Sequence, residues 1–274
     1  MLDSKQTLRS PRVIAVANQK GGVGKTTTTI NLATALAAVG ENTVILDLDP
    51  QGNASTGLGI TYKQRTSSLY NVLIDRMPLS KAMITTAVPR LSIVPSSFDL
   101  SGAELELAGV SRRSFRLRDA FAALNKDASS RNPIDYILID CPPSLNLLTI
   151  NALAAADAVL VPLQCEFFAL EGLSQLMRTI DLVKSSLNPK LEIQGIVLTM
   201  FDRRNKLSDQ VADDVRAHLG QKVYETVIPR NVRISEAPSY GKPALLYDHK
   251  CAGSQAYIQL AGELIQREKG LRAI

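Results

Sequence analysis

Residues 13–26 read VIAVANQKGGVGKT, and this short segment constrains the fold more than any other part of the chain. Its first part, Val13–Asn18, is mostly apolar and β-prone, which predicts a buried strand of a parallel sheet. A glycine-rich turn follows, and a helical pattern then runs from about Gly24 to Ala38 and ends at Gly40. A strand, a glycine loop and a helix in this order predict an α/β fold.

The glycine-rich turn has the chemistry of a phosphate-binding loop. Successive backbone N–H groups in such a turn form a concave anion site, and the helix N-terminus adds its positive end. Lys25 supplies a charge for β- and γ-phosphates, and the Thr26 hydroxyl is a ligand for Mg²⁺. A chance glycine loop in a βα unit is the alternative, and the GKT sequence directly behind a strand argues against it. The expected nucleotide contacts are Lys20, Gly21, Gly22, Val23, Gly24, Lys25, Thr26 and Thr27.

The loop departs from the standard GxxxxGK[ST] pattern at its start, where Gln19 replaces the first glycine and Lys20 follows. The form KGGVGKTT is the deviant Walker A motif and resembles the family of partitioning and positioning ATPases that includes ParA/Soj and MinD. The resemblance implies ATP and Mg²⁺ as cofactors and an ATP-bound homodimer. It also implies that Lys20 reaches across the dimer interface to the partner's nucleotide. A solvated loop lysine is the alternative for Lys20.

Aspartates end two further apolar strands. The segment 43–48 runs into Asp47-Leu48-Asp49-Pro50-Gln51-Gly52, and the segment 136–140 ends at Asp140. Ligands of open α/β sheets bind at the carboxyl ends of strands, where carboxylates can hold Mg²⁺-bound water. The family resemblance implies that Asp49 positions the hydrolytic water and that Asp47 supports the site. The expected catalytic residues are therefore Lys20, Lys25 and Asp49, and the expected metal ligands are Thr26, Asp49 and Asp140, the aspartates through water.

The whole chain follows an alternating pattern of apolar strands and helices. At least six strands with interleaved helices predict a single-domain P-loop NTPase, an α/β fold with a mostly parallel twisted sheet covered by helices on both faces. The ATPase domain is expected over 12–268, after a flexible arm at 1–11 and before a tail at 269–274. Residues 99–125 are expected to form one helix, and 253–268 the last helix. A run of 18 apolar residues and a signal-peptide core are both missing from this sequence, so no membrane segment is expected.

Basic residues follow the strand expected at 193–199. Arg203, Arg204 and Lys206 precede a helix, and the net charge of +5 permits nucleic-acid contact without demanding it. The later string Val227–Ser239 resembles the ParA/Soj signature closely. The resemblance implies that Pro229, Arg230 and Asn231 hold the adenine, that Arg204 contacts DNA with Arg203 and Lys206 as helpers, and that Arg233 and Lys242 extend the basic surface. A solvated cluster of cations is the alternative.

Taken together, the resemblance implies a DNA-partitioning switch. The ATP-bound sandwich dimer binds double-stranded DNA non-specifically, and a ParB-type centromere-binding protein stimulates slow ATP hydrolysis, in the cytoplasm at the nucleoid. A MinD-like membrane switch is the main alternative, but the tail lacks the bulky and lysine-rich faces of a lipid-binding helix. Three separated cysteines, Cys141, Cys165 and Cys251, argue against a metal-cluster carrier. A biosynthetic ligase on the same fold is not favoured, because no substrate-specific constellation appears.

Overall fold

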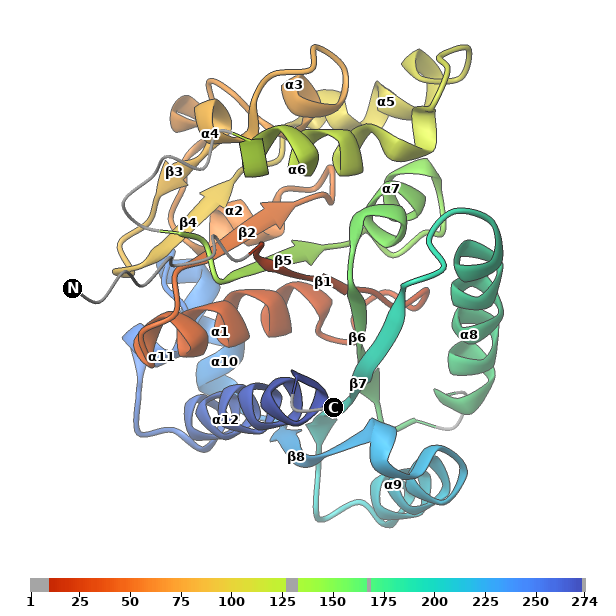
Figure 1. Cartoon of the computed structure of the whole chain (residues 1–274). Coiled ribbons are helices and arrows are strands. Elements are labelled where there is room, and N and C mark those ends of the chain that lie inside the picture. Colours follow the sequence, from red (N-terminus) through yellow and green to blue (C-terminus); the bar gives the residue numbers. More distant parts are fainter. Residues whose placement is uncertain (1–9, 127–132, 167–168, 273–274) are drawn as a thin grey trace, which may run out of the picture.

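The computed structural model describes residues 10–126, 133–166 and 169–272. Its centre is an eight-stranded sheet with the order β3-β4-β2-β5-β1-β6-β7-β8, in which only the short edge strand β3 runs antiparallel to its neighbour (Figure 1). The strands are β1 (Arg12–Val16), β2 (Thr43–Asp47), β3 (Ile84–Thr85), β4 (Leu91–Val94), β5 (Tyr136–Asp140), β6 (Ala158–Gln164), β7 (Glu192–Phe201) and β8 (Val223–Pro229).

Helices cover both faces of this sheet, as the sequence predicts (Figure 1). One face carries α1 (Lys25–Ala38), α2 (Asn53–Gly57), α10 (Val232–Glu236), α11 (Ala244–Tyr247) and α12 (Ala252–Arg272). The other carries α3 (Leu69–Leu73), α4 (Leu79–Ala82), α5 (Ala103–Glu106), α6 (Arg116–Lys126), α7 (Leu147–Ala155), α8 (Ala169–Ser186) and α9 (Lys206–Leu219). Short 3₁₀ turns lie at Tyr62–Gln64, Phe98–Gly102, Arg113–Phe115, Gly220–Lys222 and Ala237–Tyr240.

The alternation of side chains along the central strand divides the core in two. Ile14 and Val16 of β1 point to the face covered by α1 and α12, whereas Val13 and Ala15 point to the opposite face. All four are buried, because a parallel strand with helices on both sides has no solvent-facing side chain. This pattern explains why strands read as continuous apolar runs rather than as alternating ones.

The eight strands of the sheet agree with the prediction of at least six; β3 and β8 are the two that the sequence pattern did not locate. Two other expectations differ from the structure. The single helix predicted over 99–125 is wrong, since the chain there forms a 3₁₀ turn, α5, a second 3₁₀ turn and α6, with Arg112 at a left-handed φ of 58° between them. The last helix is longer than predicted and runs through Arg272. Most of the arm expected at 1–11 and the final residues of the tail lie outside the described residues.

The strand register brings the predicted site to one edge of the sheet. Asp47 at the end of β2 pairs with Asp140 at the end of β5, and Asp140 pairs with Val16 at the end of β1. The phosphate-binding loop leaves β1 at that same level and enters α1 (Figure 1). The carboxyl edge of the sheet therefore collects the loop and both strand-end aspartates, as expected for an open α/β fold.

Candidate functional site

The loop between β1 and α1 has an open concave backbone. Gly22 and Gly24 have φ angles of 75° and 88°, a left-handed conformation that side chains other than glycine rarely adopt. A Cβ added at Gly21 or Gly22 would meet no atom within 4 Å, so the space beside both residues is free. The Gly24 carbonyl accepts from Thr28 N and begins α1. This backbone fits the binding of phosphate at a helix N-terminus.

Hydrogen bonds to two other strands, β6 and β7, hold the loop in this shape. The Asn18 amide donates to the Pro162 carbonyl at 2.7 Å and its oxygen accepts from Lys20 N at 3.1 Å. The Thr199 hydroxyl, near the end of β7, donates to the Val23 carbonyl at 2.8 Å. Sequence reasoning missed Thr199 as a loop anchor, because only the folded sheet brings the end of β7 to the loop, 176 residues away along the chain.

Lys25 is the buried cation of the site. Its ammonium donates to the Lys20 carbonyl at 2.9 Å, and only 7% of the residue is exposed. Burial lowers the pKa of Lys25, while the negative charges of Asp140 and Asp49 oppose that shift. The ammonium thus lies on the inner side of the loop, where a phosphate group on the concave backbone would meet it.

Two carboxylates at the strand ends are fully buried and incompletely satisfied. Asp140 Oδ1 accepts from Thr29 Oγ1 at 3.3 Å, and Asp140 Oδ2 has no hydrogen-bond partner in the described structure. Burial, together with the charge of Asp47, raises the pKa of Asp140 well above its ordinary value, and the Thr26 hydroxyl opposes this. A buried carboxylate oxygen without a partner beside a threonine hydroxyl fits a Mg²⁺ ion, which takes oxygen ligands.

Asp47 carries the second such group. Its Oδ2 accepts from Ser55 N at 2.7 Å and from Ser55 Oγ at 2.6 Å, and its Oδ1 has no partner among the residues described. Burial raises the pKa of Asp47 to about 6. Asp49 lies two residues further on at 8% exposure, with its carboxylate accepting from Gln51 N at 3.0 Å. The predicted support and catalytic aspartates are thus both present beside the loop.

Lys20 stands at the outer end of the loop. Its ammonium is an ion-pair partner of Glu166, which follows β6, and both side chains are 43% exposed. The structure contains one chain, so the predicted contact with a partner's nucleotide stays a prediction. Glu166 was not singled out in the sequence, since it lies 146 residues away along the chain.

The C-terminal signature segment also reaches this edge of the sheet. Pro229 ends β8 and pairs with Phe201 at the end of β7, whose carbonyl accepts from Arg230 N at 3.0 Å. Asn231 caps α10 by accepting from Arg233 N. A pocket of about 300 Å³ lies between the start of α1 and the rest of this segment; its lining includes Thr26, Thr27, Ile234, Pro238 and Lys242. The adenine contact of residues 229–231 stays a prediction.

The predicted DNA-binding cations are exposed, but two of them already have acidic partners. Arg204, with 87% of its side chain exposed, forms a bidentate pair with Asp202, with Nε to Oδ1 at 3.0 Å and Nη2 to Oδ2 at 2.9 Å. These hydrogen bonds lower the pKa of Asp202 to about 2. Arg203 is exposed on the same loop, and Lys206 is exposed at the first position of α9.

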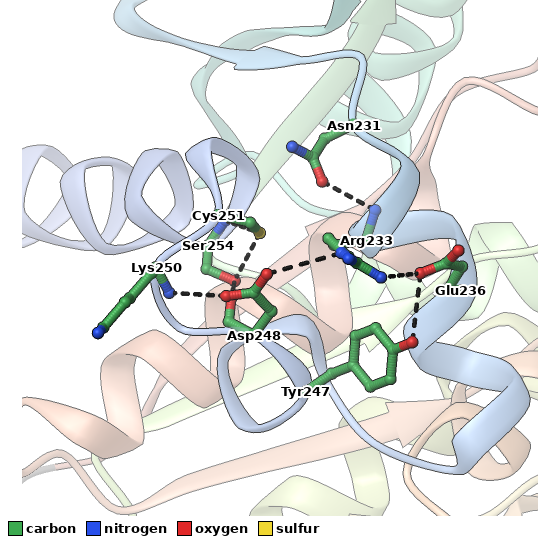
Figure 2. A network of polar contacts seen from close by, with 8 residues as sticks. All are labelled: Asn231, Arg233, Glu236, Tyr247, Asp248, Lys250, Cys251 and Ser254. Atoms are coloured by element: carbon green, nitrogen blue, oxygen red, sulfur yellow. Dashed lines mark hydrogen bonds and ion pairs between the residues drawn. The ribbon is translucent and has the colours of Figure 1, made fainter.

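Arg233 belongs to a second polar network, shown in Figure 2. Its guanidinium pairs with Glu236 at 2.9 Å and with Asp248 at 3.7 Å, and Tyr247 OH donates to Glu236 at 3.2 Å. The network joins α10 to the loop before α12 (Figure 2). Lys242 is exposed nearby in the chain and lines the pocket described above.

Comparisons with known proteins agree with this geometry. A family model described as an AAA domain matches residues 11–193. The chain is 65% identical to the chromosome partitioning protein ParA of Caulobacter vibrioides over 96% of this chain and 97% of that protein. It is 49% identical to the sporulation initiation inhibitor protein Soj of Bacillus subtilis, over 92% of this chain and 98% of that protein.

Solved structures give the same fold. A cobyrinic acid a,c-diamide synthase from Mycobacterium smegmatis with bound ATP analog and magnesium has a TM-score of 0.81 and 37% identity, covering 94% of this chain and 96% of that one. The cell division ATPase MinD of Pyrococcus furiosus has a TM-score of 0.74 and 27% identity, covering 93% and 98%. The extent and identity of the match to ParA and Soj decide the assignment. The chain belongs to the ParA/Soj family of deviant Walker A ATPases.

Proposed function

We propose that the protein is an ATP-hydrolysing switch that partitions DNA. The observation that carries the proposal is the convergence of the glycine loop, Lys25 and the two buried strand-end aspartates at one edge of the sheet. Relatives over nearly the whole chain are named chromosome partitioning proteins, which supports the biological role. Similar structures were solved with an ATP analog or ADP and with magnesium, which supports the choice of nucleotide and metal.

Each residue of the site has a defined task toward ATP. The backbone N–H groups of residues 21–27 bind phosphate oxygens, and the Lys25 ammonium exchanges the Lys20 carbonyl for the β- and γ-phosphates. Thr26, and Asp140 through water, would hold Mg²⁺, and the ion would neutralise charge on the phosphates. Asp49 accepts a hydrogen bond from the attacking water and orients it toward the γ-phosphate. Asp47 and its Ser55 contacts support the chain that carries Asp49.

ATP binding favours a homodimer in which Lys20 contacts the partner's nucleotide. To do so, Lys20 must leave Glu166. An exposed ion pair contributes only about 0–1 kcal/mol, which is small against a charge-assisted bond to phosphate. The loss of the Lys20–Glu166 ion pair therefore does not oppose dimerisation, because the bond from Lys20 to the partner's nucleotide phosphate is stronger.

The dimer binds duplex DNA through phosphates with little reading of base sequence. Dimerisation places two copies of the exposed cation set on one particle, which multiplies the number of phosphate contacts. The set consists of Arg203, Arg204, Lys206, Arg233 and Lys242. In a monomer, Asp202 and Glu236 each neutralise one arginine, so single-chain binding is weak. DNA binding thus depends on dimerisation, because the basic surface of one chain binds DNA weakly and the dimer presents two such surfaces.

Intrinsic turnover is slow, and a ParB-type protein bound at a centromere-like site stimulates it. The ParB-type protein supplies a positively charged group that the nucleotide site of this chain lacks, as arginine fingers do in other phosphoryl-transfer proteins. Hydrolysis separates the dimer and releases it from the nucleoid DNA. The slow basal rate keeps the bound state longer than the time needed to diffuse between sites.

A MinD-like membrane switch is the second candidate, because the MinD of Pyrococcus furiosus shares the fold at 27% identity. In the described part of the chain, each helix is too short or too polar to cross a bilayer. Arg203, Arg204 and Lys206 are exposed just after the carboxyl end of β7, where they are available for contacts with DNA phosphates. The two candidates share their nucleotide chemistry and differ in the surface that the ATP-bound form recognises.

Two parallel measurements test the proposal. Mass photometry of the Asp49→Ala variant, which retains ATP, should show dimers with Mg²⁺–ATP and monomers with ADP. Sedimentation with anionic vesicles under the same conditions should show no nucleotide-dependent binding. Monomers in both nucleotides would contradict the switch, and ATP-dependent sedimentation with vesicles would move the protein to the MinD-like class.

A further inference from the structure

The turn that carries Asp49 is held from outside by side chains of other elements. The turn is closed by Gly52 N donating to the Asp49 carbonyl at 2.9 Å, and Gly52 has a left-handed φ of 64°. Within the turn, only the bond from Gln51 N restrains the Asp49 carboxylate. The direction in which this carboxylate points thus depends on what fixes the two ends of the turn.

Ser96 fixes the first end. It lies two residues after β4 and is fully buried, and its hydroxyl donates to the Asp49 carbonyl at 2.6 Å. Its backbone N–H donates to Ser55 Oγ at 3.2 Å, and Ser55 in turn donates to Asp47. A continuous buried chain of hydrogen bonds therefore runs from the Asp47 carboxylate through two serines to the backbone of Asp49.

Arg65 fixes the second end. Its Nη2 donates to Thr56 Oγ1 at 2.7 Å and to the Ile60 carbonyl at 2.9 Å, and its guanidinium stacks on Tyr62 at 4.5 Å. Thr56 Oγ1 donates to the Gly52 carbonyl at 3.0 Å. Nε also donates to the Ile60 carbonyl at 3.2 Å, and Nη1 lies directly against Gly52, where an added Cβ would collide with it.

The burial of Arg65 is not explained by an ion pair. Only 9% of the residue is exposed, yet none of the ion pairs of the described residues includes it. Arginine is rarely this buried without an acidic partner, because removing the charge from water is costly. Its positive charge opposes the rise that burial causes in the pKa of Asp47. The contacts of Arg65 are instead with the backbone and hydroxyl groups around the turn.

We propose that Ser96 and Arg65 are positioning residues that hold the Asp49–Gly52 turn, and with it the Asp49 carboxylate, in the conformation needed for ATP hydrolysis. The proposal rests on the ATPase function proposed above. Neither side chain touches the loop that binds the phosphates, so both act on the turn rather than on nucleotide binding. A displacement of a catalytic group by about 1 Å can lower a rate by about 100-fold.

The test compares hydrolysis and binding in matched variants of the full chain. Ser96→Ala removes one hydroxyl, and Arg65→Gln removes the charge and the donor fork. We expect kcat to fall by about tenfold to 100-fold, as for supporting contacts of other sites, with the affinity for a fluorescent ATP analogue within about twofold of wild type. The controls are Ser101→Ala and Arg90→Gln, whose exposed side chains also donate to backbone carbonyls but lie away from the turn.

Hydrogen exchange gives a readout that does not depend on turnover. The amides of Gly52 and Thr56, which bond to the Asp49 and Gly52 carbonyls, should exchange faster in Ser96→Ala and Arg65→Gln than in either control. If Arg65→Gln folds poorly, Arg65→Lys replaces it in the test, because lysine keeps the positive charge but lacks the several donors of the guanidinium. Arg65→Lys should show the same faster exchange of the Gly52 and Thr56 amides. A kcat within twofold of wild type, or equal losses of kcat and nucleotide affinity, would overturn the inference.

The ATPase function and the positioning roles of Ser96 and Arg65 can be refuted separately. A wild-type protein that does not hydrolyse ATP would refute the proposed function, whatever the variants do. Wild-type hydrolysis combined with unchanged rates and exchange in both variants would refute only the positioning roles of Ser96 and Arg65.

Discussion

Replacing Asp47 by asparagine tests the electrostatic account of the site, because a buried ionised carboxylate opposes folding. Asp47 is fully buried, and one of its oxygens lacks a partner in the described structure. Burial raises its pKa from 3.8 to about 6. A group whose pKa is higher in the folded state gives its full stabilisation below the unfolded pKa and loses it as the pH rises through the folded one. The relevant window is therefore pH 4 to 6.

The magnitude follows from the two pKa values. The difference between 3.8 and about 6 corresponds to about 3 kcal/mol between the fully protonated and the fully ionised group. At pH 5 the wild-type protein recovers about 1–2 kcal/mol of this by binding a proton, and at pH 8 almost none. The Asp47→Asn variant has no such group. Its stability relative to wild type should therefore be higher at pH 8 than at pH 5 by about 1–2 kcal/mol.

Urea denaturation without nucleotide, with EDTA, at pH 5 and pH 8 measures this difference. The comparison cancels whatever the amide gains or loses in contacts with Ser55, because those contacts do not titrate. A melting curve should show the same trend, with a relative shift of about 2–3 °C between the two pH values. A stability difference between variant and wild type that is equal at both pH values would refute the reasoning.

Further variants test the nucleotide and DNA surfaces separately. Lys25→Ala should weaken the binding of an ATP analogue by about tenfold to 100-fold in a fluorescence titration, because a charge-assisted bond contributes about 1.5–3 kcal/mol. Asp49→Ala should leave that affinity within about threefold of wild type and abolish phosphate release in a coupled assay, since an orienting group acts on hydrolysis and not on binding. Arg204→Glu should preserve ATP hydrolysis and reduce the salt dependence of DNA binding in anisotropy titrations, as loss of one phosphate contact does. Asp202→Asn should strengthen DNA binding, since it frees Arg204 from its bidentate pair.

Each of these has a result that would count against it. Normal nucleotide binding by Lys25→Ala would remove Lys25 from the phosphate site, and a weakened affinity in Asp49→Ala would remove Asp49 from its water-orienting role. An unchanged salt slope in Arg204→Glu would place that arginine away from DNA, and weaker binding by Asp202→Asn would show that the pair arranges Arg204 rather than masks it.

The nucleotide side of the site could be predicted because its signals are local. Gly24, Lys25 and Thr26 are consecutive, and Asp140 directly ends an apolar strand. The parallel register then brings Asp140 beside Val16, as the general rule for α/β sheets implies. The buried state of Cys141 follows from the same strand end.

The parts that were missed depend on long-range contacts. β8 is an edge strand, and the N–H groups of Glu225 and Thr226 donate to the Glu263 carboxylate of α12 rather than to another strand. Hydrogen bonds from a helix carboxylate leave no pattern of apolar residues in the strand from which it could be predicted. Ser96 and Arg65 reach the Asp49 turn only after the chain has folded. The helix predicted over 99–125 is interrupted at Arg112, which has a left-handed backbone conformation. The sequence gives no sign of this interruption, because the residue is not a glycine.

The most direct test of the central claim is the affinity of wild-type protein for random-sequence duplex DNA, measured by anisotropy with Mg²⁺–ATP and with Mg²⁺–ADP at equal salt. The account predicts binding with ATP that weakens steeply as salt rises, and binding at least tenfold weaker with ADP. Equal affinity in the two nucleotides would contradict the claim that the site at the carboxyl edge of the sheet switches the basic surface that contains Arg204.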